Sequence, residues 1–204
     1  MAEVSKYLLA ARQAMQEENY ADAQKYFEMV KLDDPTNIEA KIQYQYCKFL
    51  DCVRKDSYNC YTDYMNLLKH AVINVAESEM PLEEQLAFLS HLIDDSVDAL
   101  KLCCSALSAI RVEGDDTFAT IRGLKRRSIL FARDFGDAME KKYADSPEGM
   151  QIACHAWKSF VDRINGNTSF SKKGSEVASI PTYVAKIQAI DPTYTFVEKK
   201  RGCL

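Results

Sequence analysis

An apolar seam over residues 82–111 is the feature that most constrains the fold of this chain. Large apolar residues recur there at alternating spacings of three and four, which is the period of one face of an α-helix. Only Ser96 interrupts the seam. Its members are Leu82, Leu86, Leu89, Ile93, Leu100, Cys103, Leu107 and Ile110. A seam of this length predicts one long helix, beginning near Pro81, that must bury this face against a partner.

A second apolar stripe follows after a short break and supplies such a partner. The segment VEGDD ends the first helix, and Asp115 or Asp116 is a suitable cap for the next one, over residues 116–143. This second stripe consists of Ile121, Leu124, Phe131, Phe135 and Ala138. Two long helices joined by a short turn are expected to pack as an antiparallel hairpin. The seam spans about four heptads, so a coiled-coil dimer through the same face is the alternative.

The rest of the chain has the same helical period. Only seven glycines and five prolines interrupt 204 residues, and no segment shows the sustained alternation of a half-buried strand. We therefore predict an all-α protein of antiparallel helical hairpins, stacked as a helical repeat or a bundle. Residues 1–76 and 77–204 are expected to form two continuous parts of one domain. The other predicted helices cover residues 4–17, 20–32, 37–54, 57–76, a segment capped by Ser146 with Pro147 in its first turn, and 175–190.

Composition and charge narrow the classes of function. Hydrophobic residues make up 47% of the chain and charged residues 27%, which is typical of a folded globular protein. The formal net charge of -4 argues against a general nucleic-acid binder. No apolar run reaches the roughly 20 residues that a membrane span needs, and the first residues lack the pattern of a secretory signal. The predicted location is the cytoplasm, with no nucleic acid as a partner and no membrane span.

The seven cysteines are interpreted as free thiols, several of them in the core. Their number is odd, they form no C-x-x-C pair, and the three histidines do not complete a zinc-finger spacing. A metal site or a disulfide framework is the alternative. Asp94, Asp95 and Asp98 share a helical face and could hold a divalent cation, but a solvated face is the simpler interpretation. We therefore expect neither a metal nor another cofactor.

The familiar motifs of catalysis do not occur in the sequence. It contains no P-loop, G-x-S-x-G, G-x-G-x-x-G or H-E-x-x-H motif, so we expect no enzymatic activity. An all-α enzyme with a site made of scattered residues is the alternative. The basic segment RGLKRR, residues 122–127, is interpreted as an exposed face of the long hairpin that could bind an acidic segment or phosphate. The C-terminal EKKRGCL could carry a palmitoylated Cys203.

Residues 4–37 carry a pattern of large and small side chains across two short helices. Ala11 and Ala23 allow two antiparallel helices to approach closely, and Pro35 cannot continue the second helix. The pattern consists of Tyr7, Ala10, Ala11, Ala14, Tyr20, Ala23, Phe27 and Pro35. It resembles one tetratricopeptide repeat, a helix-turn-helix unit. The next window, residues 38–71, keeps two predicted helices but not this signature, so the resemblance covers about a sixth of the chain. An ordinary helical hairpin is the alternative.

The resemblance implies a protein-interaction module or scaffold. Tetratricopeptide repeats bind peptides or protein domains on a concave surface lined by the first helix of each repeat, so the implied partner is a protein or peptide. The implied partner-binding residues are Ser5, Leu8, Arg12, Met15, Gln16 and Asn37. Family members that clamp a terminal carboxylate have Lys and Asn at the positions of Leu8 and Arg12, so binding of a chaperone tail is not implied. The alternative function is a structural bundle that forms homo-oligomers through residues 82–143.

Two residues of this unit carry separate expectations. If the unit packs as the resemblance implies, Ala23 lies at the tight crossing of the first two helices. Arg12 lies on the opposite side of the first helix and faces the groove. Its substitution is therefore expected to leave stability almost unchanged, as at most exposed positions.

Overall fold

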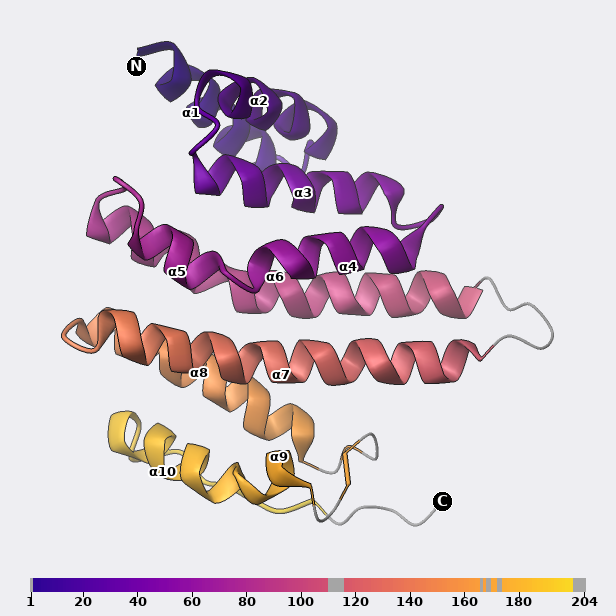
Figure 1. Cartoon of the computed structure of the whole chain (residues 1–204), viewed down its shortest axis with the longest axis vertical. Helices are drawn as coiled ribbons and strands as arrows, with labels where there is room; N and C mark the ends of the chain where they lie inside the picture. The colour runs from indigo at the N-terminus through magenta and orange to yellow at the C-terminus, as the bar shows by residue number, and fades with distance from the viewer. Residues whose placement is uncertain (1, 110–115, 166, 168–169, 172–173, 200–204) are drawn as a thin grey trace.

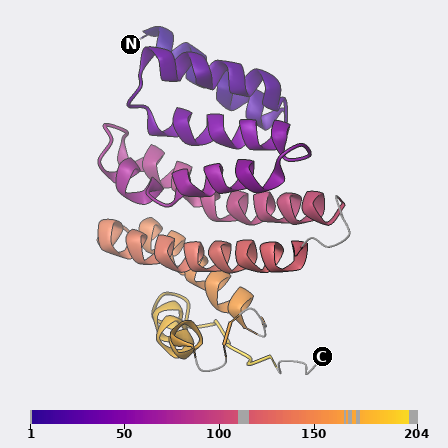
Figure 2. The same cartoon turned by 45° about the vertical axis from the view of Figure 1, so that its right-hand side comes forward.

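The computed structural model describes residues 2–109, 116–165, 167, 170–171 and 174–199, without the side chains of residues 2–5. Over these residues the chain forms helices and no strand, which confirms the all-α prediction. Figures 1 and 2 show the helices stacked along the long axis, with α1 and α2 at one end and α10 at the other. The helices are α1 (Ala2–Gln16), α2 (Tyr20–Asp33), α3 (Ile38–Cys52), α4 (Ser57–Leu68), α5 (Ala71–Ala76), α6 (Leu82–Ala109), α7 (Thr117–Tyr143), α8 (Pro147–Ile164), α9 (Ser175–Ala178) and α10 (Ile180–Ile190).

Side-chain caps fix where several helices begin. A side-chain oxygen of the residue before the helix accepts a hydrogen bond from a backbone N–H of the first turn, which would otherwise have no partner. These caps are Asn19 for α2, Asn37 for α3, Asp116 for α7 and Ser146 for α8. The predicted caps Asp116 and Ser146 are confirmed, with Pro147 in the first turn of α8. Asp115, the other candidate, lies outside the described residues.

Two predicted helices are each divided in the structure. The segment 57–76 breaks at Lys69 and His70 into α4 and α5, and the break lets α5 bury Ala71, Val72 and Val75 while it packs on α3 and α7. The segment 175–190 divides at Ser179 into α9 and α10. Pro181, in the first turn of α10, has no N–H to donate, which favours a new helix start there.

The long hairpin has the predicted arrangement. Figure 1 shows α6 and α7 side by side and antiparallel, and the two helices pack on each other. The middle of the seam is buried in the core of this same chain, including Leu89, Ile93 and Cys103. Ser96, which interrupts the seam, is also buried and donates its hydroxyl hydrogen to the Ile93 carbonyl at 2.7 Å. Leu82 at the start is exposed, and Ile110 lies outside the described residues.

The buried side chains form two clusters. The larger one runs from Ile38 in α3 to Ile187 in α10, so the core continues across residue 76 without a break. The smaller cluster joins α1 and α2 to one side of α3, and its buried members are Ala11, Ala14, Ala23, Phe27, Val30, Ala40 and Cys47. The division between the two clusters therefore runs through α3, whose opposite sides face different clusters.

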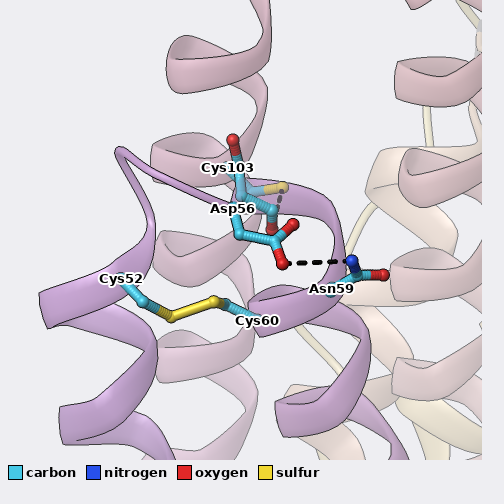
Figure 3. The surroundings of a disulfide bond; sticks show 6 residues. Cys52, Asp56, Asn59, Cys60 and Cys103 are labelled. Atoms are coloured by element: carbon cyan, nitrogen blue, oxygen red, sulfur yellow. Dashed lines mark hydrogen bonds between the residues drawn. A yellow bond between two sulfur atoms is a disulfide. The ribbon is translucent and has the colours of Figure 1, made fainter.

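A disulfide bond between Cys52 and Cys60 corrects the prediction that all thiols are free. Figure 3 shows Cys52, at the end of α3, joined across the turn to Cys60 in α4. Their Cα atoms are 6.5 Å apart, which is within the range that a disulfide spans. Sequence spacing did not identify this pair because the fold brings the two positions together. The described free cysteines are Cys47, Cys103, Cys104 and Cys154; Cys203 lies outside the described residues.

Candidate functional site

Two adjoining hollows lie between α1, α3 and α6, and we call them together the α1–α3–α6 groove. The larger has a volume of about 730 Å³ and the smaller about 430 Å³. The larger is lined by Leu8, Arg12, Asp34, Thr36, Asn37, Ile38, Glu39, Lys41, Asn74, Glu77, Ser78, Glu79, Met80, Pro81 and Glu84. The smaller is lined by Arg12, Met15, Gln16, Phe27, Glu39, Gln43, Glu84, Ala87, Phe88 and His91.

An ion cluster of three residues separates the two hollows, since all three line both of them. Arg12 of α1 donates from Nε to Glu39 Oε1 at 2.7 Å and from Nη2 to Glu39 Oε2 at 2.6 Å, which is the bidentate geometry typical of Arg and carboxylate. Arg12 Nη2 also lies 3.3 Å from Glu84 Oε2 on α6. Glu39 is 6% exposed as a side chain, Arg12 39% and Glu84 51%.

This pairing changes the expectation for Arg12. The hydrogen bonds to Glu39 raise the Arg12 pKa further above its usual value, against the opposing effect of burial. Arg12 does line the groove, but it is also the partner of a buried carboxylate. Loss of one member of such a pair leaves the other charge unpaired in the interior, which destabilises the fold. The prediction that its substitution leaves stability unchanged therefore does not hold for this contact.

The structure brings most of the residues singled out from the sequence to this groove. Leu8, Arg12 and Asn37 line the larger hollow, and Met15 and Gln16 line the smaller one together with Arg12. The side chain of Ser5 lies outside the described part of the structure. Besides Arg12, two of these residues have contacts that hold the fold together.

Met15 and Asn37 are the residues with such contacts. The Sδ atom of Met15 accepts a hydrogen bond from Cys47 at 3.4 Å. The Oδ1 atom of Asn37 accepts one from the Ala40 N–H at 2.9 Å, which caps α3. Their positions at the groove are therefore also explained by packing and capping.

The opposite wall of the groove was missed by sequence reasoning. It comes from α6, where Glu84, Phe88 and His91 recur at spacings of four and three beside the seam. This spacing shows that the residues share a helical face. It does not show which helix covers that face, so the pairing of Glu84 with Arg12 could be found only from the fold.

The acidic residues along the middle of α6 do not form a cation site in the structure. Asp94 lies 3.0 Å from His155 Nε2, and Asp98 accepts from Lys101 at 2.7 Å. Asp95 is half-buried, and burial raises its pKa to about 6. The prediction that all three carboxylates lie on a solvated face is therefore wrong for Asp95. Within the described residues, no group of His, Cys, Asp or Glu side chains has an arrangement that could hold a metal ion.

The basic segment RGLKRR has its charged side chains on the surface of α7. Arg126 pairs with Glu176 at 2.6 Å and lies over the ring of Phe170, with 5.3 Å between Cζ and the ring centroid. Part of this segment therefore anchors the start of α9 to α7.

Comparison of the chain with models of known protein families, with curated protein sequences and with solved structures finds no match. Among the helices that the structure describes, none combines the length and the apolar character required to cross a bilayer.

Proposed function

We propose that this protein is an interaction module, without catalytic activity, that binds a segment of a partner protein in the α1–α3–α6 groove. One observation carries the proposal. Five residues that the tetratricopeptide resemblance implies for partner binding line the two adjoining hollows of one groove. The groove lies between α1, α3 and α6, and stacked helical units create concave binding surfaces of this kind.

The charges along the groove favour binding over catalysis. The Thr36 hydroxyl and backbone N–H donate to Asp34 and lower its pKa, while Glu39 raises that of Arg12. Both shifts stabilise the charged form of the group at neutral pH. A general acid or base needs the opposite, a pKa moved toward the working pH. The cytoplasmic location remains part of this proposal, and the disulfide is the observation against it, because disulfides are rare in reducing compartments.

Photo-crosslinking from two matched alanines tests the proposal. Ala87 is exposed on the groove wall, and Ala21 is exposed on α2 outside the residues that line the groove. A photoreactive phenylalanine analogue at position 87 is expected to form an adduct with one defined protein from a lysate. The same analogue at position 21 is expected to form none. Mass spectrometry of the adduct identifies the protein.

Two arginine variants provide the control for this experiment. Ala87→Arg fills the groove and is expected to abolish binding of the identified partner, whereas Ala21→Arg is expected to retain it. Partner binding that survives Ala87→Arg would show that the binding surface lies elsewhere.

Oligomerisation through the long hairpin is the weaker proposal. It relied on an apolar seam available to a second chain, but the middle of that seam packs inside this chain. We therefore expect light scattering to give the mass of a monomer.

A further inference from the structure

The two carboxylates that contact Arg12 differ in how they hold it. Glu39 is nearly buried and makes two short hydrogen bonds to the guanidinium, so it holds the Arg12 side chain in place. Glu84 is half-exposed and makes one contact at 3.3 Å. An incoming cation could therefore pair with Glu84 while Arg12 remains bound to Glu39. Glu84 is thus the carboxylate in the ion cluster that is available to a ligand.

The larger hollow carries an excess of negative charge. Its described lining contains five carboxylates, Asp34, Glu39, Glu77, Glu79 and Glu84, and two cations, Arg12 and Lys41. Lys142 offsets one carboxylate from outside the lining, since its Nζ lies 3.2 Å from Glu77. The remaining excess favours a positively charged ligand and repels an acidic one.

The smaller hollow is more apolar. Met15, Phe27, Ala87 and Phe88 line it, together with the amide of Gln43. The Oε1 atom of Gln43 is buried and has no hydrogen-bond partner. The terminal torsion of a Gln side chain has broad preferences, so a small rotation could turn this oxygen toward a donor on a ligand. Because an amide oxygen only accepts hydrogen bonds, a donor on the ligand is needed to satisfy it.

Resting on the proposed function, we infer that the occupant of the groove is a cationic segment of a partner protein. A Lys or Arg of this segment pairs with Glu84, and a neighbouring apolar side chain enters the smaller hollow between Met15 and Phe88. The two hollows meet at the ion cluster, so both contacts come from residues close together in the bound segment. Glu84 is then the residue that selects for positive charge, and the apolar wall holds the segment.

Fluorescence anisotropy with three synthetic peptides tests this inference. The peptides share length and leucine positions and differ only in carrying Lys, Gln or Glu at the remaining variable positions. We expect the Lys peptide to bind at least about tenfold more tightly than the Gln peptide, and the Glu peptide to bind most weakly. The advantage of the Lys peptide should shrink as salt is raised, because screening weakens partly exposed ion pairs.

Two variants that each remove one negative charge separate recognition from overall attraction. Glu84→Gln removes the groove carboxylate and is expected to abolish the advantage of the Lys peptide. Glu28→Gln removes an exposed carboxylate on α2, outside the groove lining, and is expected to preserve it. Both variants should melt at the parent temperature, since neither removes the Arg12–Glu39 pair.

The outcomes distinguish this inference from the proposed function. Equal affinity for the Lys and Gln peptides, or an advantage for Lys that survives Glu84→Gln, overturns the inference. If Ala87→Arg still abolishes peptide binding in that case, the groove remains the binding surface. If Ala87→Arg changes nothing, the proposed function fails as well. If no peptide binds, the inference also fails. Crosslinking from position 87 then tests independently whether the groove is the partner-binding surface.

Discussion

The α1–α2 pair and the α7–α8 pair both bring two helices close together, but by different means. In the first pair, Ala11 and Ala23 are fully buried, so small side chains stand on both helices. In the second, Gly136 of α7 has no side chain and faces Trp157 of α8, which is fully buried. A Cβ atom built on Gly136 would lie 2.5 Å from the indole ring and 3.2 Å from the Ala153 carbonyl oxygen.

Two helices can therefore approach closely in two different ways. The two ways differ in how strongly a substitution at the crossing destabilises the fold. Two small residues leave a modest cluster in which aromatic side chains fill the remaining space, as Phe27 does beside Ala23. A glycine opposite a tryptophan instead accommodates the largest side chain in the main core. The indole is further held because Trp157 Nε1 donates to Asp137 at 3.1 Å. The α7–α8 crossing should therefore be the less tolerant of the two.

The largest effect is expected at Trp157. Trp157→Ala should lower the free energy of unfolding by about 3–5 kcal/mol, because it leaves a cavity in the main core. Gly136→Ala should cost about 1–3 kcal/mol in the parent by overpacking. In the Trp157→Ala background the same change should cost clearly less, because the clashing ring is gone and only the 3.2 Å approach to the Ala153 carbonyl oxygen remains. Urea melts of the four proteins measure this coupling, and additive effects would contradict the close approach.

The next effect tests how α1 is joined to the rest of the chain. Arg12→Glu should destabilise by roughly 2–4 kcal/mol, since it places a second carboxylate beside the nearly buried Glu39. The double variant Arg12→Met and Glu39→Met should recover most of this loss, because apolar groups replace both members of the pair. Thermal melts at matched pH compare the variants. A stable Arg12→Glu protein would show that the α1–α2 pair does not depend on this contact.

Reduction of the Cys52–Cys60 disulfide tests the region between the two helix pairs. For a loop this short, loss of the cross-link should cost about 2–3 kcal/mol. Titration in denaturant without reductant should find at most five thiols, since two of seven cysteines are paired.

The reaction rate of the buried thiols in the folded protein provides a second measurement. Burial raises the pKa of Cys47 and of Cys103 to about 12, so these thiols should react slowly until the protein unfolds. Seven rapidly titrated thiols in denaturant would contradict the disulfide.

Ala23→Phe tests the α1–α2 crossing directly. The fully buried Ala23 has no space for a ring, so the change should destabilise by about 1–3 kcal/mol. Ala21→Phe, at an exposed position on the same helix, should stay within about 0.5 kcal/mol of the parent. Denaturant melts of the two variants compare the positions. Equal stability of both would remove the argument that small side chains set this crossing.

The smallest effect concerns Asp95 on α6, whose charge also contributes to the raised pKa of Tyr46 and Tyr20. Burial raises the Asp95 pKa to about 6, with further increases from Asp94 and Asp98 and an opposing effect of His91. The folded state therefore holds this proton more tightly than the unfolded state. Its contribution to stability is complete below about pH 4 and is lost as the pH rises through about 6.

Asp95→Asn removes this dependence. The variant should be more stable than the parent at pH 7 by about 1–2 kcal/mol, with allowance for the exposed part of the side chain. Melts between pH 4 and pH 7 should show the difference growing with pH. A constant difference would mean that Asp95 titrates normally.

The sequence by itself determined the local features of this protein. The helical period, most of the two apolar stripes of residues 82–143 and the caps Asp116 and Ser146 depend on neighbours a few residues apart, so they were predicted and found. The small residues Ala11 and Ala23 could be recognised for the same reason, because both helices belong to one short unit.

Only the tertiary structure decided which faces meet. Gly136 and Trp157 lie on different helices, and neither residue specifies the other's position. The Cys52–Cys60 disulfide depends on how α3 and α4 pack, and the pairing of Arg12 with Glu84 joins residues of α1 and α6. Periodicity shows that a face must be covered, but the covering partner depends on packing among all the helices. For this reason one wall of the groove could be predicted from the sequence and the other could not.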